Sequence, residues 1–408
     1  MRILFVDDER SILDGLRHRL RPQRQRWEMS FVEGGHEALA LMGEAPFDVI
    51  VTDMRMPGMD GAALLEEVRL AYPASARIVL SGHAEKSAML HAVATAHQFL
   101  PKPCPAGVLE STIERVARFQ SIVHDAAVRE AVGSIGCLPT QPPIYAALLA
   151  ALADEGALAD RVAHILRQDS ALCLRMLQLV NSAYFQPPHQ VVSIDEAVLY
   201  LGLDTIQQLA LIAGVFTRST ASAPHPELPL VELQQHAQLA GAIAAALCPQ
   251  REDKEAAFIA ALLHDIGKLA LATTLPARLD QVAHEIREGA ADMAAVERRS
   301  FGVSHAEIGA YLLGLWQVPF LITEAIANHH TPARVPEQTG LTLIAAVHIA
   351  DALACEVGDA SYPCIAHPRT EPDAAYLAAL GLSEKLPAWR TLAREIAAAL
   401  LTAEVSGT

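Results

Sequence analysis

The sequence is short of basic residues. Lysine and arginine number 31 against 47 aspartates and glutamates, so the 408-residue chain has a formal net charge of −16. Broad binding to a phosphate backbone needs a positive surface, which this composition does not favour. The most basic stretch, RHRLRPQRQR at 17–26, is interpreted as a solvated helix end and the loop after it. We therefore expect no direct DNA binding.

Long apolar runs and cysteine pairs are also missing. No uninterrupted apolar run reaches the roughly 18 residues of a membrane span. The N-terminal MRILFVDDE becomes acidic too early for a secretory signal with a long apolar segment. The six cysteines include no CxxC pair, as expected of reduced thiols in a cytosolic protein. These observations predict a cytoplasmic protein that does not bind membranes.

What the chain does contain is typical of well-packed globular domains. Apolar residues make up 52% and charged residues 19% of the sequence, which argues against extensive disorder. A chain of this length exceeds what one hydrophobic core usually organises. Two or three domains are therefore expected.

Short β-type runs alternate with helical spacing over residues 1–120. The expected strands are 3–7, 28–33, 47–53, 76–82 and 97–103. Alternating strands and helices predict a doubly wound α/β domain, with a parallel sheet covered on both faces. In such a sheet the chemistry lies at the carboxyl ends of the strands.

Beyond about residue 120 the strand signal ends. Residues 121–135 predict a helical linker, and the proline-containing GCLPTQPP then interrupts the chain. The remainder, 136–408, reads as an all-α domain rich in alanine and leucine, without a repeat of fixed period. A weaker boundary near 217–229 would divide it into lobes of about 136–220 and 229–408.

Acidic residues stand where two expected strands end: Asp7 and Asp8 after the first, and Asp53 after the third. Carboxylates brought together at adjacent strand ends repel each other unless a hard cation such as Mg²⁺ joins them. Ser81 adds a hydroxyl and Lys102 a positive charge at the ends of the fourth and fifth strands. Together these groups can accept and hold a phosphoryl group. The alternative is that these five residues are ordinary turn residues at strand ends, but that interpretation does not explain why all five positions match.

The strings FVDDE, VTDMRMPGMDG, LSGH and FLPKP resemble the receiver domains of two-component response regulators over about 1–120. The resemblance implies a flavodoxin-like fold with Asp53 as the phosphoacceptor. It implies Mg²⁺ coordination by Asp8, Asp53 and the backbone carbonyl of Arg55, while Asp7 helps through water. A sensor histidine kinase would supply the phosphoryl group.

The same resemblance implies roles for residues of the last two strands. Lys102 would pair with the phosphoryl oxygens, and Lys102–Pro103 would be a cis peptide. Ser81 and Phe99 would form the switch pair, in which the hydroxyl moves to the phosphoryl group and the ring turns inward. Receivers often dimerise through their fourth helix, fifth strand and fifth helix, so a homodimer is one expectation.

Metal-ligand residue types recur along the expected helices of the second lobe. They are Glu232, His236, His264, Asp265, Lys268, His305, His329, His330 and Asp351. Glu232 and His236 are four residues apart and so share one side of a helix. His264–Asp265 lies within the apolar ALLHDIGKLAL, where a buried charge needs a partner. Such residues from several helices could enclose one or two metals; the alternative is a set of structural core histidines.

The helical region resembles the HDOD domain in its LPT-x-P opening, DSAL, NSAYF at 181–185 and AVLYLGL. We expect Asn181 and Ser182 to act in capping or buried hydrogen bonds. HDOD domains are relatives of the HD superfamily of metal-dependent phosphohydrolases, which includes the HD-GYP phosphodiesterases that hydrolyse cyclic di-GMP. The resemblance implies that the histidines and aspartates above fall on ligand positions for Fe, Mn or Zn. It likewise matches Lys268 to the lysine that assists the phosphate.

One departure bears on activity. HD-GYP domains follow the histidine pair with an acidic segment and a GYP motif, whereas this chain has HHTPARVPEQTG at 329–340. HDOD domains are regarded as regulatory relatives. The leading hypothesis is a non-enzymatic output domain, controlled by Asp53 phosphorylation, that acts through protein or nucleotide binding. The alternative is a phosphorylation-gated phosphodiesterase acting on cyclic dinucleotides. A transcription factor is the weakest reading, because no helix-turn-helix signature follows the receiver.

Overall fold

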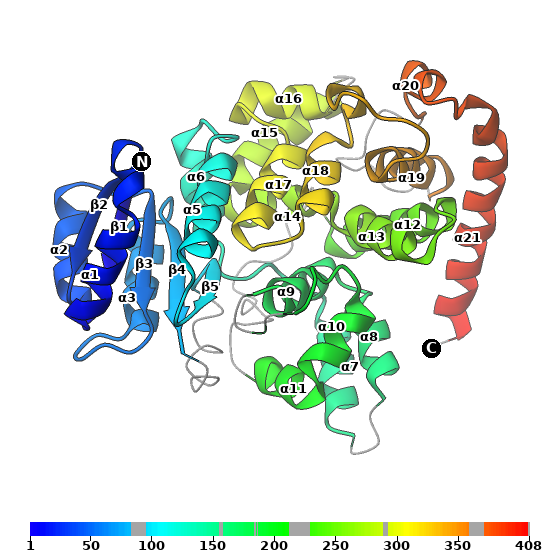
Figure 1. Ribbon diagram of the computed structural model, residues 1–408. Helices are drawn as coiled ribbons and strands as arrows, with labels where there is room; N and C mark the ends of the chain where they lie inside the picture. The colour runs from blue at the N-terminus through cyan, green and yellow to red at the C-terminus, as the bar shows by residue number, and fades with distance from the viewer. Residues whose placement is uncertain are drawn as a thin grey trace.

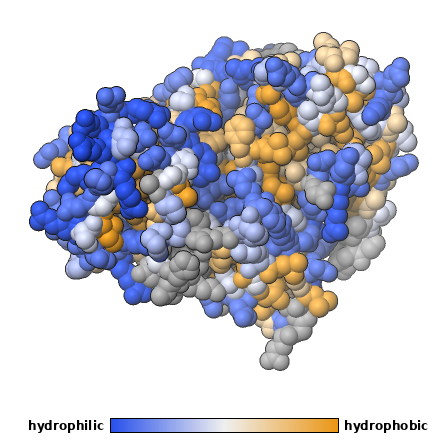
Figure 2. Space-filling model, viewed as in Figure 1, coloured by the Kyte–Doolittle hydropathy of each residue, from blue (hydrophilic) through white to orange (hydrophobic). Residues whose placement is uncertain are grey.

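A computed structural model describes residues 1–82, 95–154, 158–182, 185, 187–211, 229–288, 293–358 and 371–406. An α/β unit at the N-terminus adjoins a larger helical region (Figure 1). Hydrophilic side chains cover most of the visible α/β unit, and apolar ones gather over the middle of the helical region (Figure 2).

The α/β unit is a five-stranded parallel sheet with the strand order β2-β1-β3-β4-β5, which confirms the predicted doubly wound fold. Its elements are β1 (Arg2–Val6), α1 (Arg10–Arg19), η1 (Arg21–Gln25), β2 (Glu28–Val32), α2 (Gly35–Glu44), β3 (Val49–Asp53), α3 (Gly61–Ala71), β4 (Ala76–Ser81), β5 (Gln98–Pro101) and α5 (Ala106–Gln120).

The register of this sheet brings two acidic positions together. Every residue of the central strand β3 is buried, as expected of a strand covered on both faces. Val6 of β1 pairs with Thr52 of β3, so the residues that follow them, Asp7 and Asp53, lie side by side at the carboxyl edge.

A short helix, α6 (Ala126–Gly133), leads from the α/β unit into the helical region. The first group of helices consists of α7 (Pro142–Leu152), α8 (Ala159–Leu166), α9 (Ser170–Val180), α10 (Ile194–Leu201) and α11 (Leu203–Leu211). The side chain of Asn181 donates to the carbonyls of Leu177 and Val191, and Ser182 donates to Leu179. Both side chains therefore have the structural bonding expected of them; Ala183 and Tyr184 of NSAYF lie outside the described residues.

The second group of helices forms the larger lobe. It consists of α12 (Leu230–Leu247), α13 (Arg251–Leu263), α14 (Ile266–Thr274), α15 (Pro276–Arg287), α16 (Met293–Phe301), α17 (His305–Leu315), α18 (Phe320–Asn328), η2 (Pro332–Arg334), α19 (Leu343–Val357), α20 (Ala374–Ala379), η3 (Ser383–Lys385) and α21 (Leu386–Ser406). The boundary expected near 217–229 lies almost wholly outside the described residues.

One apolar segment of the described chain, Asp253–Thr274, passes a length and composition test for a membrane span. Its most apolar window is 83% buried inside the protein. The segment comprises α13 and α14, which pack against α12, α17, α18 and α19. It is therefore a core element, and the charged pair His264–Asp265 stands at its centre.

Candidate functional sites

The first cluster lies at the carboxyl edge of the sheet and consists of Asp7, Asp53 and Lys102. The Lys102 Nζ atom is 2.7 Å from Asp7 Oδ2 and also contacts Asp53 Oδ1. Asp7 is 1% and Asp53 7% exposed. Burial raises the pKa of Asp7 from its usual value, although the hydrogen bond from Lys102 opposes the shift. The lysine thus bridges two carboxylates held at adjacent strand ends and offsets one of their two negative charges.

The loop after β3 shapes this edge. The backbone N–H of Arg55 donates to Asp53 Oδ2 at 2.9 Å, which leaves the other carboxylate oxygen to Lys102. Gly61, the first residue of α3, touches the backbone of Asp53, where a Cβ atom would overlap the Asp53 carbonyl. A glycine is required there because the helix starts directly against the strand end.

The other residues expected at this edge differ in placement. Asp8 is exposed beside the buried Asp7. Phe99 lies in β5 and is 1% exposed, so its ring is already turned into the protein. Ser81 is the last residue of β4, but its side chain lies outside what the structure describes. The Lys102–Pro103 peptide is cis, as expected.

The second cluster, called here the histidine–aspartate cluster, brings together residues from distant helices. His236 comes from α12, His264 and Asp265 from the junction of α13 and α14, His305 from the start of α17, His329 and His330 from the end of α18, and Asp351 from α19. Three overlapping groups offer ligand atoms within 4.8 Å of one another: His236, His264 and Asp351; His264, Asp265 and His329; and His305, His329 and His330.

Asp265 stands between the two halves of the cluster. Its Oδ2 atom is 3.3 Å from His264 Nε2, and its Oδ1 atom is 3.3 Å from His305 Nε2. In one half, Asp351 Oδ1 is 3.1 Å from His236 Nε2 and 3.3 Å from His264 Nε2. In the other half, the Nε2 atoms of His305 and His330 are 2.8 Å apart. This arrangement has the donor types and spacing of a site for one or two transition metals.

The bonding of the inner residues fits a metal. The Nδ1 atoms of His264 and His329 lie 2.5 and 2.7 Å from the carbonyls of Ala261 and Ile326 and can donate to them. The Nε2 lone pairs then face the centre of the cluster. These two Nε2 atoms and Asp265 Oδ1 are buried and make no hydrogen bond in the described chain, although His264 Nε2 and Asp265 Oδ1 have the ion-pair contacts at 3.3 Å given above. Since buried polar atoms are normally hydrogen-bonded, three such ligand atoms close together match the needs of a cation.

The electrostatics of the cluster also favour positive charge at its centre. Burial alone would lower the pKa of His264, but the carboxylates of Asp265 and Asp351 raise it to about 10, so these carboxylates favour either a proton or a metal ion at its Nε2 atom. Burial keeps the pKa of His329 well below its usual range, and the neighbouring His264 lowers it further. His329 is therefore a neutral imidazole, which is the form that binds metals.

Two supporting residues were not anticipated from the sequence. Glu297 of α16 is fully buried, and its Oε2 atom is 2.6 Å from His305 Nδ1 and accepts from the His305 backbone N–H at 2.8 Å. His348 of α19 lies 2.7 Å from the carbonyl of His329 through Nδ1. Glu297 fixes the ring orientation of the candidate ligand His305, and His348 holds the backbone at His329. The only sequence signal was weak: a lone glutamate among arginines, and a histidine three residues before Asp351.

Two residues expected in the histidine–aspartate cluster, Glu232 and Lys268, are not among its grouped ligand atoms in the described chain. Glu232 lies one turn before His236 on α12 and is half-buried, but it belongs to none of the three groups of ligand atoms among the described residues. Lys268, 3% exposed, donates to Asp265 Oδ2 at 2.7 Å. The lysine therefore reaches the cluster, while Glu232 stands apart from it here.

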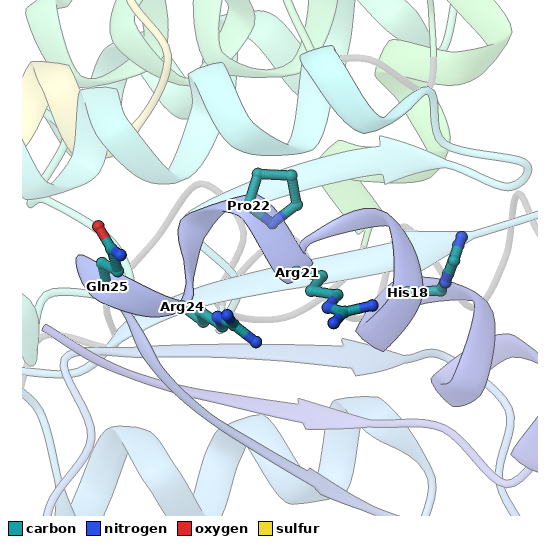
Figure 3. A pocket seen from close by; sticks show the side chains of 5 residues that line it. All are labelled: His18, Arg21, Pro22, Arg24 and Gln25. Atoms are coloured by element: carbon teal, nitrogen blue, oxygen red, sulfur yellow. The ribbon is translucent and has the colours of Figure 1, made fainter.

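A third feature is basic. His18, Arg21, Pro22, Arg24 and Gln25, from the end of α1 and from η1, line a hollow of about 450 Å³ (Figure 3). The arginines and the histidine are exposed, in agreement with the solvated helix end and loop expected at 17–26. None of these residues belongs to either cluster.

Two family models match the chain. Residues 3–114 match the response regulator receiver domain, and residues 138–332 match the HDOD domain. The first model spans the sheet with its acidic edge, and the second ends just after the histidine pair.

Individual proteins match over parts of the chain. A response regulator receiver protein of Anaeromyxobacter sp. is 41% identical over 88 residues, which are 22% of this chain and 36% of that protein. The hydrogenase transcriptional regulatory protein HoxA of Cupriavidus necator is 34% identical over 125 residues, 30% of this chain and 25% of that protein. The chain thus spans about a quarter to a third of the length of these relatives. The crystal structure of the MmoQ response regulator from Methylococcus capsulatus is 24% identical, covering 62% of this chain and 98% of that one, with a TM-score of 0.46.

The parallel sheet with its acidic edge, followed by a helical region with a histidine–aspartate cluster, defines a signalling protein with a receiver and an HD-type helical domain. The chain is a response regulator with an N-terminal receiver domain and a C-terminal HDOD domain.

Proposed function

We propose that phosphorylation of Asp53 controls a regulatory HDOD output domain that holds a divalent metal and acts through protein or nucleotide binding. The observation that carries the proposal is the presence, in one chain, of an acidic edge bridged by a lysine and a cluster of buried ligand atoms that make no hydrogen bond in the described chain. The sequence lacks the GYP motif after its histidine pair, which favours regulation over hydrolysis.

The receiver chemistry follows from the edge residues. Mg²⁺, held by Asp8, Asp53 and the Arg55 carbonyl with help from Asp7, would offset the charge of an incoming phosphoryl group. Lys102 already touches Asp53 and would move its ammonium group to a phosphoryl oxygen. A sensor histidine kinase is the proposed phosphodonor, and the cytoplasm is the proposed location. The proposed units are 1–120, the linker 121–135, and 136–408 with its two lobes.

The phosphorylation step has a direct test. Wild-type protein and Asp53→Asn would be incubated with Mg²⁺ and acetyl phosphate, then examined by intact mass and by hydrogen exchange. We expect a phosphoryl adduct on the wild type alone, accompanied by altered exchange in residues 136–408. A phosphorylated wild type whose helical domain exchanges as before would refute control of the output.

The metal is tested separately, by elemental analysis of protein purified without chelators. The expected result is one or two equivalents of Fe, Mn or Zn per chain, lost in a His264→Ala/Asp265→Ala variant. Absence of metal from the wild type after reconstitution would reduce the cluster to a structural relic.

A phosphodiesterase acting on cyclic dinucleotides is the second candidate. It is favoured by Lys268, whose ammonium group reaches the cluster through Asp265. A bound metal would supply an activated water and neutralise phosphodiester charge. Against it stands burial, since His264, His305 and His329 are each 0% exposed. The candidate fails if Mn²⁺- or Fe²⁺-loaded protein cleaves cyclic di-GMP no faster than His264→Ala does.

A further inference from the structure

Helix α17 touches both functional parts of the molecule. Its first residue, His305, belongs to the histidine–aspartate cluster. Its last residue, Leu315, accepts a hydrogen bond at 3.2 Å from the side chain of Gln98, the first residue of receiver strand β5. Just beyond the helix, Gln317 donates to Gln98 Oε1 at 2.9 Å. At 11 residues, α17 bridges a distance of about 16 Å between the cluster and the receiver.

The packing at both ends of α17 is close. At the receiver end, Gly314 lies against the ring of Phe119 in α5, and a Cβ atom on Gly314 would overlap that ring. At the cluster end, α17 crosses α14 at Gly267 and Gly309, and a Cβ atom on Gly267 would overlap the His305 carbonyl. The contact is backbone to backbone at the cluster end and helix backbone to a buried aromatic ring at the receiver end. Such close packing absorbs little movement, so a shift at one end displaces the other.

The receiver end is connected to the phosphoacceptor by a single short strand. Strand β5 begins with Gln98 and continues with Phe99, and Lys102 follows its end. Gln98 is 1% exposed and its side chain points to α17, whereas neighbouring Phe99 points to the opposite face of the sheet. Lys102 bonds to both Asp7 and Asp53. A phosphoryl group on Asp53 must redirect Lys102, and the strand between Lys102 and Gln98 carries that change to α17.

We propose that α17 couples the two sites, so that phosphorylation of Asp53 changes the affinity of the histidine–aspartate cluster for a divalent metal. The proposal rests on the proposed function, because it requires a metal in the cluster. Coupling between two binding equilibria is reciprocal: metal in the cluster changes the affinity of the receiver for a phosphoryl mimic by the same factor.

The test is titration calorimetry of the full chain with Mn²⁺ in saturating Mg²⁺, with and without beryllium fluoride as a stable phosphoryl mimic. The His264→Ala variant gives the background from the receiver, and Asp53→Asn removes the response to the mimic. For the wild type we expect the mimic to change the Kd for Mn²⁺ by about fivefold or more.

Two variants disrupt the contact between α17 and the receiver, one on the receiver side and one on the α17 side. Gln98→Ala removes the hydrogen bonds to Leu315 and Gln317, and Gly314→Ala pushes α17 away from Phe119. Each should abolish the effect of the mimic while Mn²⁺ still binds. Gln25→Ala, exposed in η1, is the matched control and should behave as wild type.

The outcomes separate the two proposals. Mn²⁺ binding that is unaffected by the mimic in the wild type overturns the coupling and leaves the metal site standing. Coupling that survives in both Gln98→Ala and Gly314→Ala overturns the route through α17. Absence of Mn²⁺ binding beyond the His264→Ala background overturns the metal site and the coupling together.

Discussion

Glu297 offers the sharpest test of how the histidine–aspartate cluster is built. Its Oε2 atom is bonded to both the ring Nδ1 and the backbone N–H of His305, and Glu297 Oε1 has no hydrogen-bond partner in the described chain. In Glu297→Gln the volume is conserved, but the charge is lost and one carboxylate oxygen becomes a donor. The amide oxygen can still accept from His305, but the imidazole loses the negative charge that strengthens this bond and so holds its tautomer and ring orientation.

The size of the effect follows from this role. Partners that orient a metal ligand typically contribute 10- to 100-fold in metal affinity, which corresponds to about 1.4–2.7 kcal/mol. Stability without metal should respond differently, since Glu297→Gln removes a fully buried carboxylate whose desolvation is unfavourable. We therefore expect metal binding to weaken by about 10- to 100-fold, while the metal-free protein unfolds at the same or higher denaturant concentration.

The assay is competition of Glu297→Gln and wild type for Zn²⁺ or Mn²⁺ against a chromophoric chelator, beside urea unfolding in EDTA. Glu285→Gln is the matched control, because Glu285 forms an exposed pair with Arg299. Unchanged metal affinity in a folded Glu297→Gln protein would refute the orienting role. A large loss of metal-free stability would instead make Glu297 a structural residue.

Three further outcomes are expected. Gly267→Ala should cost about 1–3 kcal/mol in urea unfolding, because the new methyl group overlaps the His305 carbonyl; Gly15→Ala, which meets nothing within 4 Å, should stabilise by a few tenths to about 1 kcal/mol. Burial and a neighbouring arginine hold the pKa of His97 well below its usual 6.5. Below about pH 6.5 His97 therefore takes up a proton in the unfolded chain but not in the folded one, so the free energy of unfolding should fall as the pH drops. The fall should be smaller in His97→Gln. EDTA should lower the melting temperature of metal-loaded wild type but leave His264→Ala unchanged, and equal shifts would contradict a metal in the cluster.

The sequence predicts those sites in which the residue type and its place in a strand or helix are enough to indicate the chemistry. Asp7, Asp53 and Lys102 each stand at a strand end, and parallel strands necessarily bring their carboxyl ends to one edge. The histidine–aspartate cluster could be anticipated because paired residues such as His264–Asp265 are costly in an apolar helix unless something binds them.

The supporting residues could not be predicted in this way, because their roles arise from tertiary packing. Glu297 stands in the sequence MAAVERRSF, which resembles an exposed helix face, yet α16 turns it wholly inward toward His305. Gln98 and Gln317 are distant in sequence, and neither has a charge or a motif that marks it. Glu232 is the opposite case, a residue that the sequence suggests and the fold does not support. It is four residues from His236 and so shares a side of the helix with it, but among the described residues it belongs to none of the groups of ligand atoms.

The docking of α17 also bears on the homodimer expected from the receiver. The surface considered for dimerisation includes the fifth strand and fifth helix, and its fourth helix lies outside the described residues. Here Gln98 of β5 and Phe119 of α5 are covered by α17 of the same chain. A second receiver cannot use these residues while α17 occupies them. Dimerisation through this face and coupling to the histidine–aspartate cluster are therefore competing uses of one surface, and whatever releases α17 favours the dimer at the expense of the coupling.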